Sequence, residues 1–225
     1  MSQPFYVAPE QMMKDRADYA RKGIARGRAL VALRYTEGLV IVAENGSDTL
    51  RKVSEIYDRI AFAGVGKYNE FDQLRVAGVR AADLKGFQYS RDDVDARSLA
   101  NSYAQMLGNI FTHEMKPMEV EILVAEVGLA EEGDQMFHLL YDGTVVDARD
   151  YAAIGGDAEA VRERLAATWS AGLGRSAAVH VGLNALSGPD REISAAELEV
   201  AELSRSHGRR CFSRIDATEL AAILA

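Results

Sequence analysis

The residues that could carry out chemistry gather around one expected hairpin near the N-terminus. Residues 28–35 (RALVALRY) and 38–44 (GLVIVAE) predict two strands joined by a turn at Thr36-Glu37. A hydrolase that attacks its substrate with the chain's own first residue would begin such a hairpin with Thr, Ser or Cys. Here Arg28 holds that place, with 27 residues before it, and a guanidinium offers donors but no attackable oxygen. The sequence predicts the hairpin without its nucleophile.

A second candidate is the loop that follows the hairpin, where hydroxyl groups lie close to a lysine. Ser47 and Thr49 precede Lys52, and a serine beside a lysine could act as an activated nucleophile. Because no Gly-x-Ser-x-Gly or Ser-x-x-Lys pattern supports this chemistry, we interpret Ser47 as a turn residue. Lys52 could instead bind a carboxylate as a point charge. Taken alone, however, the local sequence favours a solvated lysine on a short strand.

The sequence gives little support for a metal-binding site or a nucleotide-binding site. No two of the four histidines, His113, His138, His180 and His207, have the i, i+3 or i, i+4 spacing of a metal site, and His207 with Cys211 makes only a weak pair. Residues 64–66 (GVG) lack the third glycine and the Lys-Ser/Thr of a phosphate loop, and are interpreted as the start of a helix. The sequence therefore predicts no metal and no cofactor.

Length and composition predict one soluble intracellular domain spanning residues 1–225. Cys211 is the only cysteine, so an internal disulfide is excluded. No apolar run approaches the roughly 20 residues that span a bilayer, and no signal peptide is recognisable. The net charge is −8, with six basic and three acidic residues in positions 1–28, which leaves −11 on the remainder. The basic leader is interlaced with acids, so we expect neither nucleic acid nor membrane as a partner.

Hydrophobic periodicity predicts a leader helix over residues 9–26, with Pro9 at its first position. Its apolar stripe is Met13, Ala17, Ala20 and Ile24, which must pack either on the chain's own core or on a neighbour. Further helices are expected at 67–85, 93–113, 158–171, 175–187 and 216–224. Strands are expected at 60–63, 119–127, 135–141, 198–203 and 211–215, with one or two more within 145–154.

The first two of these further helices each have an expected inward face. The faces comprise Phe71, Leu74, Gly78 and Ala81, and then Leu99, Tyr103, Met106, Leu107, Ile110 and Phe111. Strands in hairpins alternating with helices in pairs predict an α+β fold of layers packed face to face, without crossover helices.

Several strings resemble the proteasome α/β family, and most closely its actinobacterial α-subunits. They are residues 4–11 (PFYVAPEQ), 21–26 (RKGIAR), 43–45 (AEN), 66–71 (GKYNEF), 99–105 (LANSYAQ) and 116–121 (KPMEVE). The resemblance runs from about residue 4 to 224 and implies a four-layer αββα sandwich of the N-terminal nucleophile hydrolase type over residues 28–225. It also implies an extra N-terminal helix over 9–26 and a gate segment over 1–8.

The resemblance also implies a role without catalysis. Catalytic subunits of the family begin the first strand with a threonine that has an Asp and a Lys nearby. In this chain, Arg28, Glu44 and Lys52 take the three places. The resemblance therefore implies that the chain is a non-catalytic subunit of the outer seven-membered rings of an α7β7β7α7 barrel. The peptidase activity of that barrel resides in the β-subunit.

The resemblance assigns roles to particular residues of this subunit. Lys52 would receive the C-terminal carboxylate of a ring-shaped ATPase or other activator, and the leader stripe would pack between neighbouring subunits. The loop at His113, Glu114, Met115 and Lys116 would line the entrance annulus, and the gate would comprise Ser2, Gln3, Pro4, Phe5, Tyr6, Val7 and Ala8.

The implied process is cytoplasmic degradation of proteins tagged with the small prokaryotic ubiquitin-like protein, which the ATPase recognises. Protein substrates would pass through the ring in transit to the β-subunits. Two alternatives stay open: an active hydrolase of the same fold, and a stand-alone α/β protein that binds a small ligand.

Overall fold

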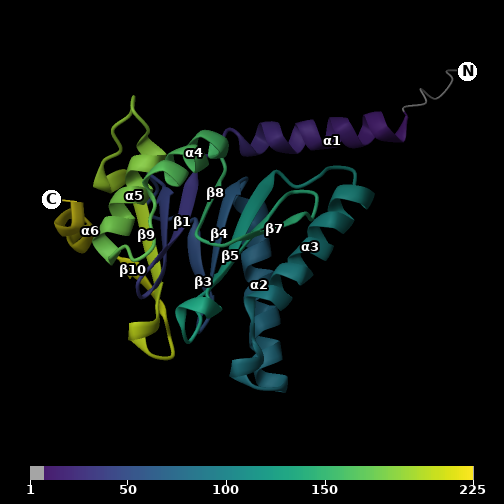
Figure 1. The fold of residues 1–225 in the computed structure, drawn as a ribbon. Helices are drawn as coiled ribbons and strands as arrows, with labels where there is room; N and C mark the ends of the chain where they lie inside the picture. The colour runs from purple at the N-terminus through teal and green to yellow at the C-terminus, as the bar shows by residue number, and fades with distance from the viewer. Residues whose placement is uncertain (1–7, 225) are drawn as a thin grey trace, which may run out of the picture.

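Two five-stranded antiparallel sheets, packed face to face, form the centre of the computed structural model, which describes residues 8–224 (Figure 1). The strand order is β10-β9-β2-β1-β8 in the first sheet and β3-β4-β5-β6-β7 in the second. The strands are β1 (Leu30–Tyr35), β2 (Gly38–Glu44), β3 (Val53–Tyr57), β4 (Ile60–Gly66), β5 (Val120–Glu126), β6 (Gln135–Leu139), β7 (Val145–Ala148), β8 (Tyr151–Ile154), β9 (Leu198–Ser204) and β10 (Phe212–Ile215).

Helices cover the outer face of each sheet. The second sheet packs on α2 (Tyr68–Gln88) and α3 (Ala96–His113), and the first on α4 (Ala158–Thr168), α5 (Arg175–Ser187) and α6 (Ala217–Leu224). Helix α1 (Pro9–Ile24) lies across one end of the sandwich, at the top of Figure 1. Short 3-10 turns are η1 (Arg91–Asp93), η2 (Glu131–Gly133), η3 (Ala195–Glu197) and η4 (Arg205–His207). The predicted αββα sandwich with an N-terminal helix is therefore confirmed.

Strand β2 shows why its sequence is apolar at nearly every position. Leu39 and Ile41 point into the core between the two sheets, whereas Val40 and Val42 point into the core under the outer helices. Because both faces of the strand are covered, all seven of its residues are buried. Burying each Leu or Val side chain contributes about 1.5 to 3 kcal/mol, so this strand anchors both cores.

The glycine pair at 64–66 does not begin a helix, so that prediction is wrong. Both glycines lie in β4, and α2 starts after them at Tyr68. Gly64 lets the Phe71 ring approach closely, since a Cβ there would lie 2.7 Å from it. Gly66 has a φ of +98°, and a Cβ would meet the Glu119 carbonyl oxygen at 2.0 Å. The spacing therefore reflects close packing at a strand end.

Two residues of the expected inward helix faces point elsewhere. In α2 the buried position is Ala82, and Ala81 is exposed. In α3 the buried face follows Leu99, Tyr103 and Leu107 at four-residue spacing, and Met106 is exposed at its edge. Both corrections arise because a helix face at 3.6 residues per turn admits two neighbouring positions, and packing against the sheet selects one of them.

The apolar stripe of α1 packs partly against the core of its own chain. Ala20 and Ile24 are buried in the core between the sheets, and Ala17 packs against its edge. Met13 is only partly covered. Ala20 and Ile24 have almost no exposed surface, so they are not available for the expected contact with a neighbouring subunit. Of the stripe, the Met13 end keeps exposed surface for such a contact.

Candidate functional site

Three sequence-predicted residues meet at the end of the sandwich nearest α1. Arg28 lies between α1 and β1, Glu44 is the last residue of β2, and Lys52 directly precedes β3. Antiparallel pairing of β1 with β2 brings the first two together, since the Glu44 amide donates to the Ala29 carbonyl at 3.2 Å. Lys52 joins them from the other sheet, through its Nζ, which donates to the Arg28 carbonyl oxygen at 2.6 Å.

Glu44, in the place of the catalytic acid, is neutralised by two guanidinium groups. Its carboxylate is 3% exposed and accepts hydrogen bonds from Arg28 and Arg191. A buried carboxylate is stable only when it is paired, and here both partners come from positively charged side chains. Glu44 therefore holds the Arg28 side chain at the head of β1, where a nucleophile would need open space.

The Lys52 ammonium is half-buried and lightly partnered. Among the described residues, the Arg28 carbonyl oxygen is the only acceptor within hydrogen-bond distance of its Nζ, although an ammonium carries three donors. Burial, aided by the Arg28 charge and opposed by Glu44 and Glu199, lowers the pKa of Lys52 to about 8. At neutral pH it stays mostly protonated, with donors available to an incoming anion.

Glu199, which the sequence analysis missed, fixes the backbone around Lys52. Its carboxylate is 4% exposed and accepts the Lys52 amide at 2.8 Å and the Val53 amide at 3.3 Å. It also accepts from the Asn45 side chain at 2.8 Å and forms an ion pair with Arg214 at 2.5 Å. One buried carboxylate on β9 thus hydrogen-bonds to Asn45 at the start of the loop that carries Lys52, and to the Lys52 and Val53 amides at its end. A glutamate inside the apolar run of β9 was its only sequence signal.

Ser47, the serine candidate near Lys52, makes hydrogen bonds within its own loop. Ser47 Oγ accepts the Leu50 amide at 3.0 Å, and Asn45 Oδ1 accepts the Ser47 amide at 3.1 Å. In the part of the chain that the structure describes, no hydroxyl hydrogen-bonds to Lys52 Nζ. The site can therefore attract and hold an anionic group, and the described residues offer it no nucleophile paired with a base.

The expected annulus loop lies against α1. Arg16 on α1 donates to the Glu114 carbonyl at 2.5 Å, and Lys116 approaches the Tyr19 ring to 5.5 Å. Lys116 also forms ion pairs with Glu70 at 2.7 Å and Glu119 at 2.8 Å. Burial opposes the charge on Lys116, but these hydrogen bonds raise its pKa.

The other two loop residues carry no such network. Met115 is fully exposed, and His113 Nδ1 lies 3.2 Å from the Asn109 carbonyl at the end of α3. Two segments predicted separately, the leader helix and the loop at residues 113–116, therefore form one surface.

The predicted gate lies almost wholly outside the described residues. Of its members only Ala8 is described, as the extended residue before α1. Within residues 8–224, no group of three His, Cys, Asp or Glu side chains is arranged to hold a metal ion. The same range contains no helix with both the length and the apolar character that crossing a bilayer requires.

Comparison with known proteins finds matches over nearly the whole chain. The family model "Proteasome subunit" matches residues 24–203. "Proteasome subunit alpha" of Acidimicrobium ferrooxidans is 62% identical over 220 residues, covering 98% of this chain and 95% of the relative. The proteins of the same name from Kineococcus radiotolerans and Thermomonospora curvata are 54% and 53% identical, each covering 100% of this chain and 99% of the relative.

Proposed function

The chain belongs to the proteasome family as an alpha subunit of the core, and from that membership we propose that it is a non-catalytic gating and docking subunit. In this proposal seven copies form each outer ring of an α7β7β7α7 barrel. The rings control entry to an inner chamber where β-subunits cut the substrate.

The observation that carries the proposal is the arrangement of Arg28, Glu44 and Lys52. A guanidinium stands at the head of β1, and Glu44 holds it in place. Since Arg28 has no oxygen or sulfur that could attack a carbonyl, the family's peptidase chemistry has no nucleophile at this position. The places of the acid and the lysine keep a carboxylate and an ammonium, but the Glu44 carboxylate is already paired with Arg28 and Arg191, whereas Lys52 is lightly partnered.

Docking of an activator's C-terminal carboxylate is supported by the state of Lys52. Its ammonium has one acceptor among the described residues, and the surrounding backbone is fixed by Glu199. The adjoining depression of 280 Å³ is lined by Arg28, Arg164 and Arg191, together with Glu44 and Asp157. A carboxylate arriving here gains a charge-assisted hydrogen bond without having to order the lysine loop first.

Gating is supported by the position of α1. Helix α1 lies across one end of the sandwich (Figure 1), and Arg28 and Lys52 meet at that end. In the sequence, the residues of the proposed gate, Ser2 to Ala8, directly precede the helix. Its contacts with the loop at residues 113–116, which the proposal assigns to the entrance annulus, support this role. The proposal assigns Met13, at the more exposed end of the stripe, to the contact with the next subunit in the ring.

The proposed setting is the cytoplasm, where a ring-shaped ATPase or other activator docks at the Lys52 residues of the ring. Protein substrates marked with the prokaryotic ubiquitin-like tag then pass the gate in transit to the β-subunits. The partners in this scheme are further copies of the chain, the β-subunit and the activator, with no nucleic acid, membrane or cofactor.

The test is the native mass of the purified chain with and without the β-subunit, measured together with peptidase activity. We expect no peptide hydrolysis by the chain alone, and a large active particle once the β-subunit is added. A stable 24.5 kDa monomer that ignores the β-subunit would favour the stand-alone ligand-binding protein. Autocleavage that exposes a new N-terminus, with hydrolysis by the chain alone, would favour the active hydrolase.

A further inference from the structure

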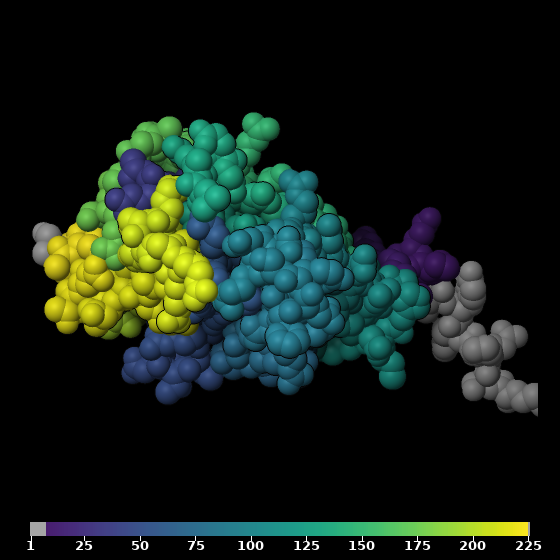
Figure 2. Space-filling model, turned by 90° about the horizontal axis from the view of Figure 1, so that it is seen from below, coloured from purple at the N-terminus to yellow at the C-terminus, as the bar shows by residue number. Residues whose placement is uncertain are grey.

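A groove of 550 Å³ lies between α1 and the loop that follows α3, and we call it the helix groove. Its apolar members are Met12 and Tyr19 on α1, and Met115 and Pro117 on the loop. Met12 and Tyr19 are 44% and 47% exposed, and Met115 is 100% exposed. Figure 2 shows α1, in purple, next to the teal end of α3, in agreement with the hydrogen bonds between them. Large apolar side chains gathered in one hollow indicate a binding surface for an apolar occupant.

The charged side chains of the helix groove are already engaged within the chain. Arg16 donates to a backbone carbonyl oxygen of the loop at 2.5 Å, and Lys116 forms an ion pair with Glu70 at 2.7 Å. Asp15 accepts a hydrogen bond from the Gln11 side chain at 2.7 Å. The groove therefore favours an uncharged apolar occupant, because a charged one would lose its hydration and compete for partners that are already taken.

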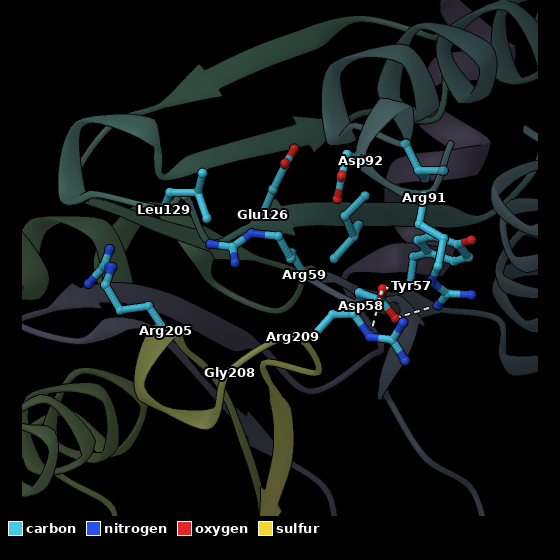
Figure 3. Close-up of a pocket in the computed structure, with 13 residues that line it drawn as sticks. Tyr57, Asp58, Arg59, Arg91, Asp92, Glu126, Leu129, Arg205, Gly208 and Arg209 are labelled. Atoms are coloured by element: carbon cyan, nitrogen blue, oxygen red, sulfur yellow. Dashed lines mark hydrogen bonds and ion pairs between the residues drawn. The ribbon is translucent and has the colours of Figure 1, made fainter. Parts of the chain in front are cut away.

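A groove of 570 Å³ at the other end of the sandwich has a different character (Figure 3). Arg91 makes two hydrogen bonds to Asp58 there, at 2.9 and 2.5 Å, and Arg59 and Glu126 also line the walls. Walls with so many charges suit a polar neighbour. Of these two grooves, the helix groove is the one that fits an apolar segment.

The chain carries a matching segment directly before α1. Residues 4–7 read Pro-Phe-Tyr-Val, and positions 2–7 contain no charged side chain. Ala8, the first described residue, is extended, with a φ of −60° and a ψ of 139°, and precedes Pro9. Proline has no amide hydrogen and disfavours the helical conformation in the residue before it, so α1 does not continue backwards through Ala8. The chain therefore leaves the helix axis at this residue.

Position and length connect this segment to the helix groove. Val7 and Met12 occupy the place before the N-cap and the fourth helical place, where two apolar side chains commonly pack together as a hydrophobic staple. Met12 is at the near end of the groove, and Tyr19 lies about 10 Å further along the helix axis, at 1.5 Å per residue. Three extended residues span about 10 Å. Residues 5–7 therefore match the groove in length.

We propose that residues 5–7 of the same chain lie in the helix groove and that this position holds the proposed gate open. In this position Val7 packs on Met12, and Phe5 packs against Met115. Because successive side chains of an extended segment face opposite sides, the tyrosine between them faces water.

The inference rests on the proposed function, in which the segment before α1 closes the entrance of the ring. A segment laid back along its own helix is withdrawn from that entrance. The groove and the entrance then compete for the same few residues, so an activator opens the gate by shifting the balance between two positions.

The first test is a disulfide formed in the full chain without the β-subunit. Phe5→Cys is combined with Met115→Cys, and the only native cysteine, Cys211, is buried. The matched control combines Phe5→Cys with Lys14→Cys, because Lys14 is exposed two residues after Met12 and so lies on the opposite face of α1. Both are oxidised with diamide, and disulfide formation is followed by non-reducing electrophoresis and mass. We expect the Met115 pair to react at least about tenfold faster, although Lys14 is closer to Phe5 along the chain.

The outcomes of this test separate the possible occupants. A fast disulfide within one chain supports the proposal. A disulfide between two chains would assign the groove to a neighbouring copy and overturn the proposal. Equal rates for the two pairs would show that the short tether alone brings the thiols together, and would overturn it as well.

The second test asks whether the groove acts on the gate. In particles assembled with the β-subunit, Met12→Ser should lower the activator-stimulated rate of peptide hydrolysis about threefold, because the open position loses a contact. In particles that lack residues 2–7 the same substitution should lower the rate much less, since the segment on which it acts is missing. Lys14→Ser, on the opposite face of α1, should match wild type. Thermal unfolding of each lone chain shows that it is folded.

Failure of this inference can be told apart from failure of the proposed function. If wild-type particles respond to activator but Met12→Ser has no effect, or has the same effect with and without residues 2–7, the groove does not hold the gate. If wild-type particles do not respond to activator at all, the proposed gating function has failed. The disulfide test does not depend on that response, because it is read on the chain without the β-subunit.

Discussion

The Lys52 ammonium lies 2.6 Å from the backbone carbonyl oxygen of Arg28, the residue that stands where a nucleophile would begin the first strand. The contact links the two sheets, because Arg28 precedes β1 and Lys52 precedes β3. The ammonium thus meets a neutral acceptor. Under the proposed function, its charge serves to bind an incoming carboxylate.

Replacing Lys52 with alanine should weaken docking of a peptide that carries a free C-terminal carboxylate. Losing one charge-assisted hydrogen bond costs about 1.5 to 3 kcal/mol, which corresponds to about 10- to 100-fold in affinity. A peptide with the C-terminal sequence of an activator is titrated onto assembled particles, and its affinity is compared with that of its C-terminal amide. Amidation should weaken binding to wild type but not to Lys52→Ala. The control is Lys22→Ala on α1, and an unchanged affinity in Lys52→Ala would remove Lys52 from the site.

The same docking should depend on pH with the pKa of Lys52, which is about 8. Above that pH the amine loses its proton, so peptide affinity should fall between about pH 7 and pH 9 in wild type. Lys52→Met cannot titrate and should show weak binding without this fall. Isothermal titration across the pH range provides the comparison, and a wild-type profile that stays flat through pH 9 would contradict the role of the ammonium.

Arg28, Glu44 and Lys52 could be found from the sequence because one hairpin and the loop after it bring them together. Glu199 was missed because it lies 147 residues from Lys52 along the chain, and only the pairing of β9 with β2 brings it close. Arg191 was missed for the same reason, since it is also 147 residues from Glu44. Hydrophobic periodicity located the strands and helices well, but it misread Gly64 and Gly66, whose role depends on Phe71 and on the Glu119 backbone.

Glu199 should be essential for the stability of the Lys52 segment. Glu199→Leu leaves Arg214 without its carboxylate partner, with only the Val53 carbonyl still accepting from it, and removes the acceptor of the Lys52 and Val53 amides. Breaking a buried ion pair costs about 3 to 5 kcal/mol, and the partial exposure of Arg214 favours the lower end. The free energy of unfolding in urea is compared with that of Glu192→Leu, an exposed control in the loop before β9, which should stay near wild type. Equal stability of the two variants would show that the network is dispensable.

Gly66→Ala and Gly23→Ala should differ sharply, although both new methyl groups would collide with Glu119. At Gly66 the obstacle is the Glu119 carbonyl oxygen at 2.0 Å, and the φ of +98° is itself unfavourable for alanine. We expect a loss of about 2 to 4 kcal/mol there. At Gly23 the obstacle is the flexible end of the Glu119 side chain, at 2.3 Å, and alanine favours the helix by about 1 kcal/mol. Thermal unfolding of both variants tests this, and a Gly66→Ala protein as stable as wild type would contradict it.

Removing the segment before α1 should open the proposed gate without loosening the subunit. The Ala8 carbonyl accepts the Met12 amide at 3.0 Å, so a deletion of residues 2–7 keeps the first turn of the helix intact. Particles assembled with this variant should hydrolyse a short fluorogenic peptide faster than wild type in the absence of activator, because entry limits the rate. Adding activator should then bring little further gain, whereas wild type should respond strongly. The unfolding temperature of the lone variant serves as the control and should match that of the intact chain. If the deletion leaves the unstimulated rate unchanged while activator still accelerates hydrolysis, the barrier to entry lies elsewhere, and the exposed Met115 of the adjoining loop becomes the next position to test.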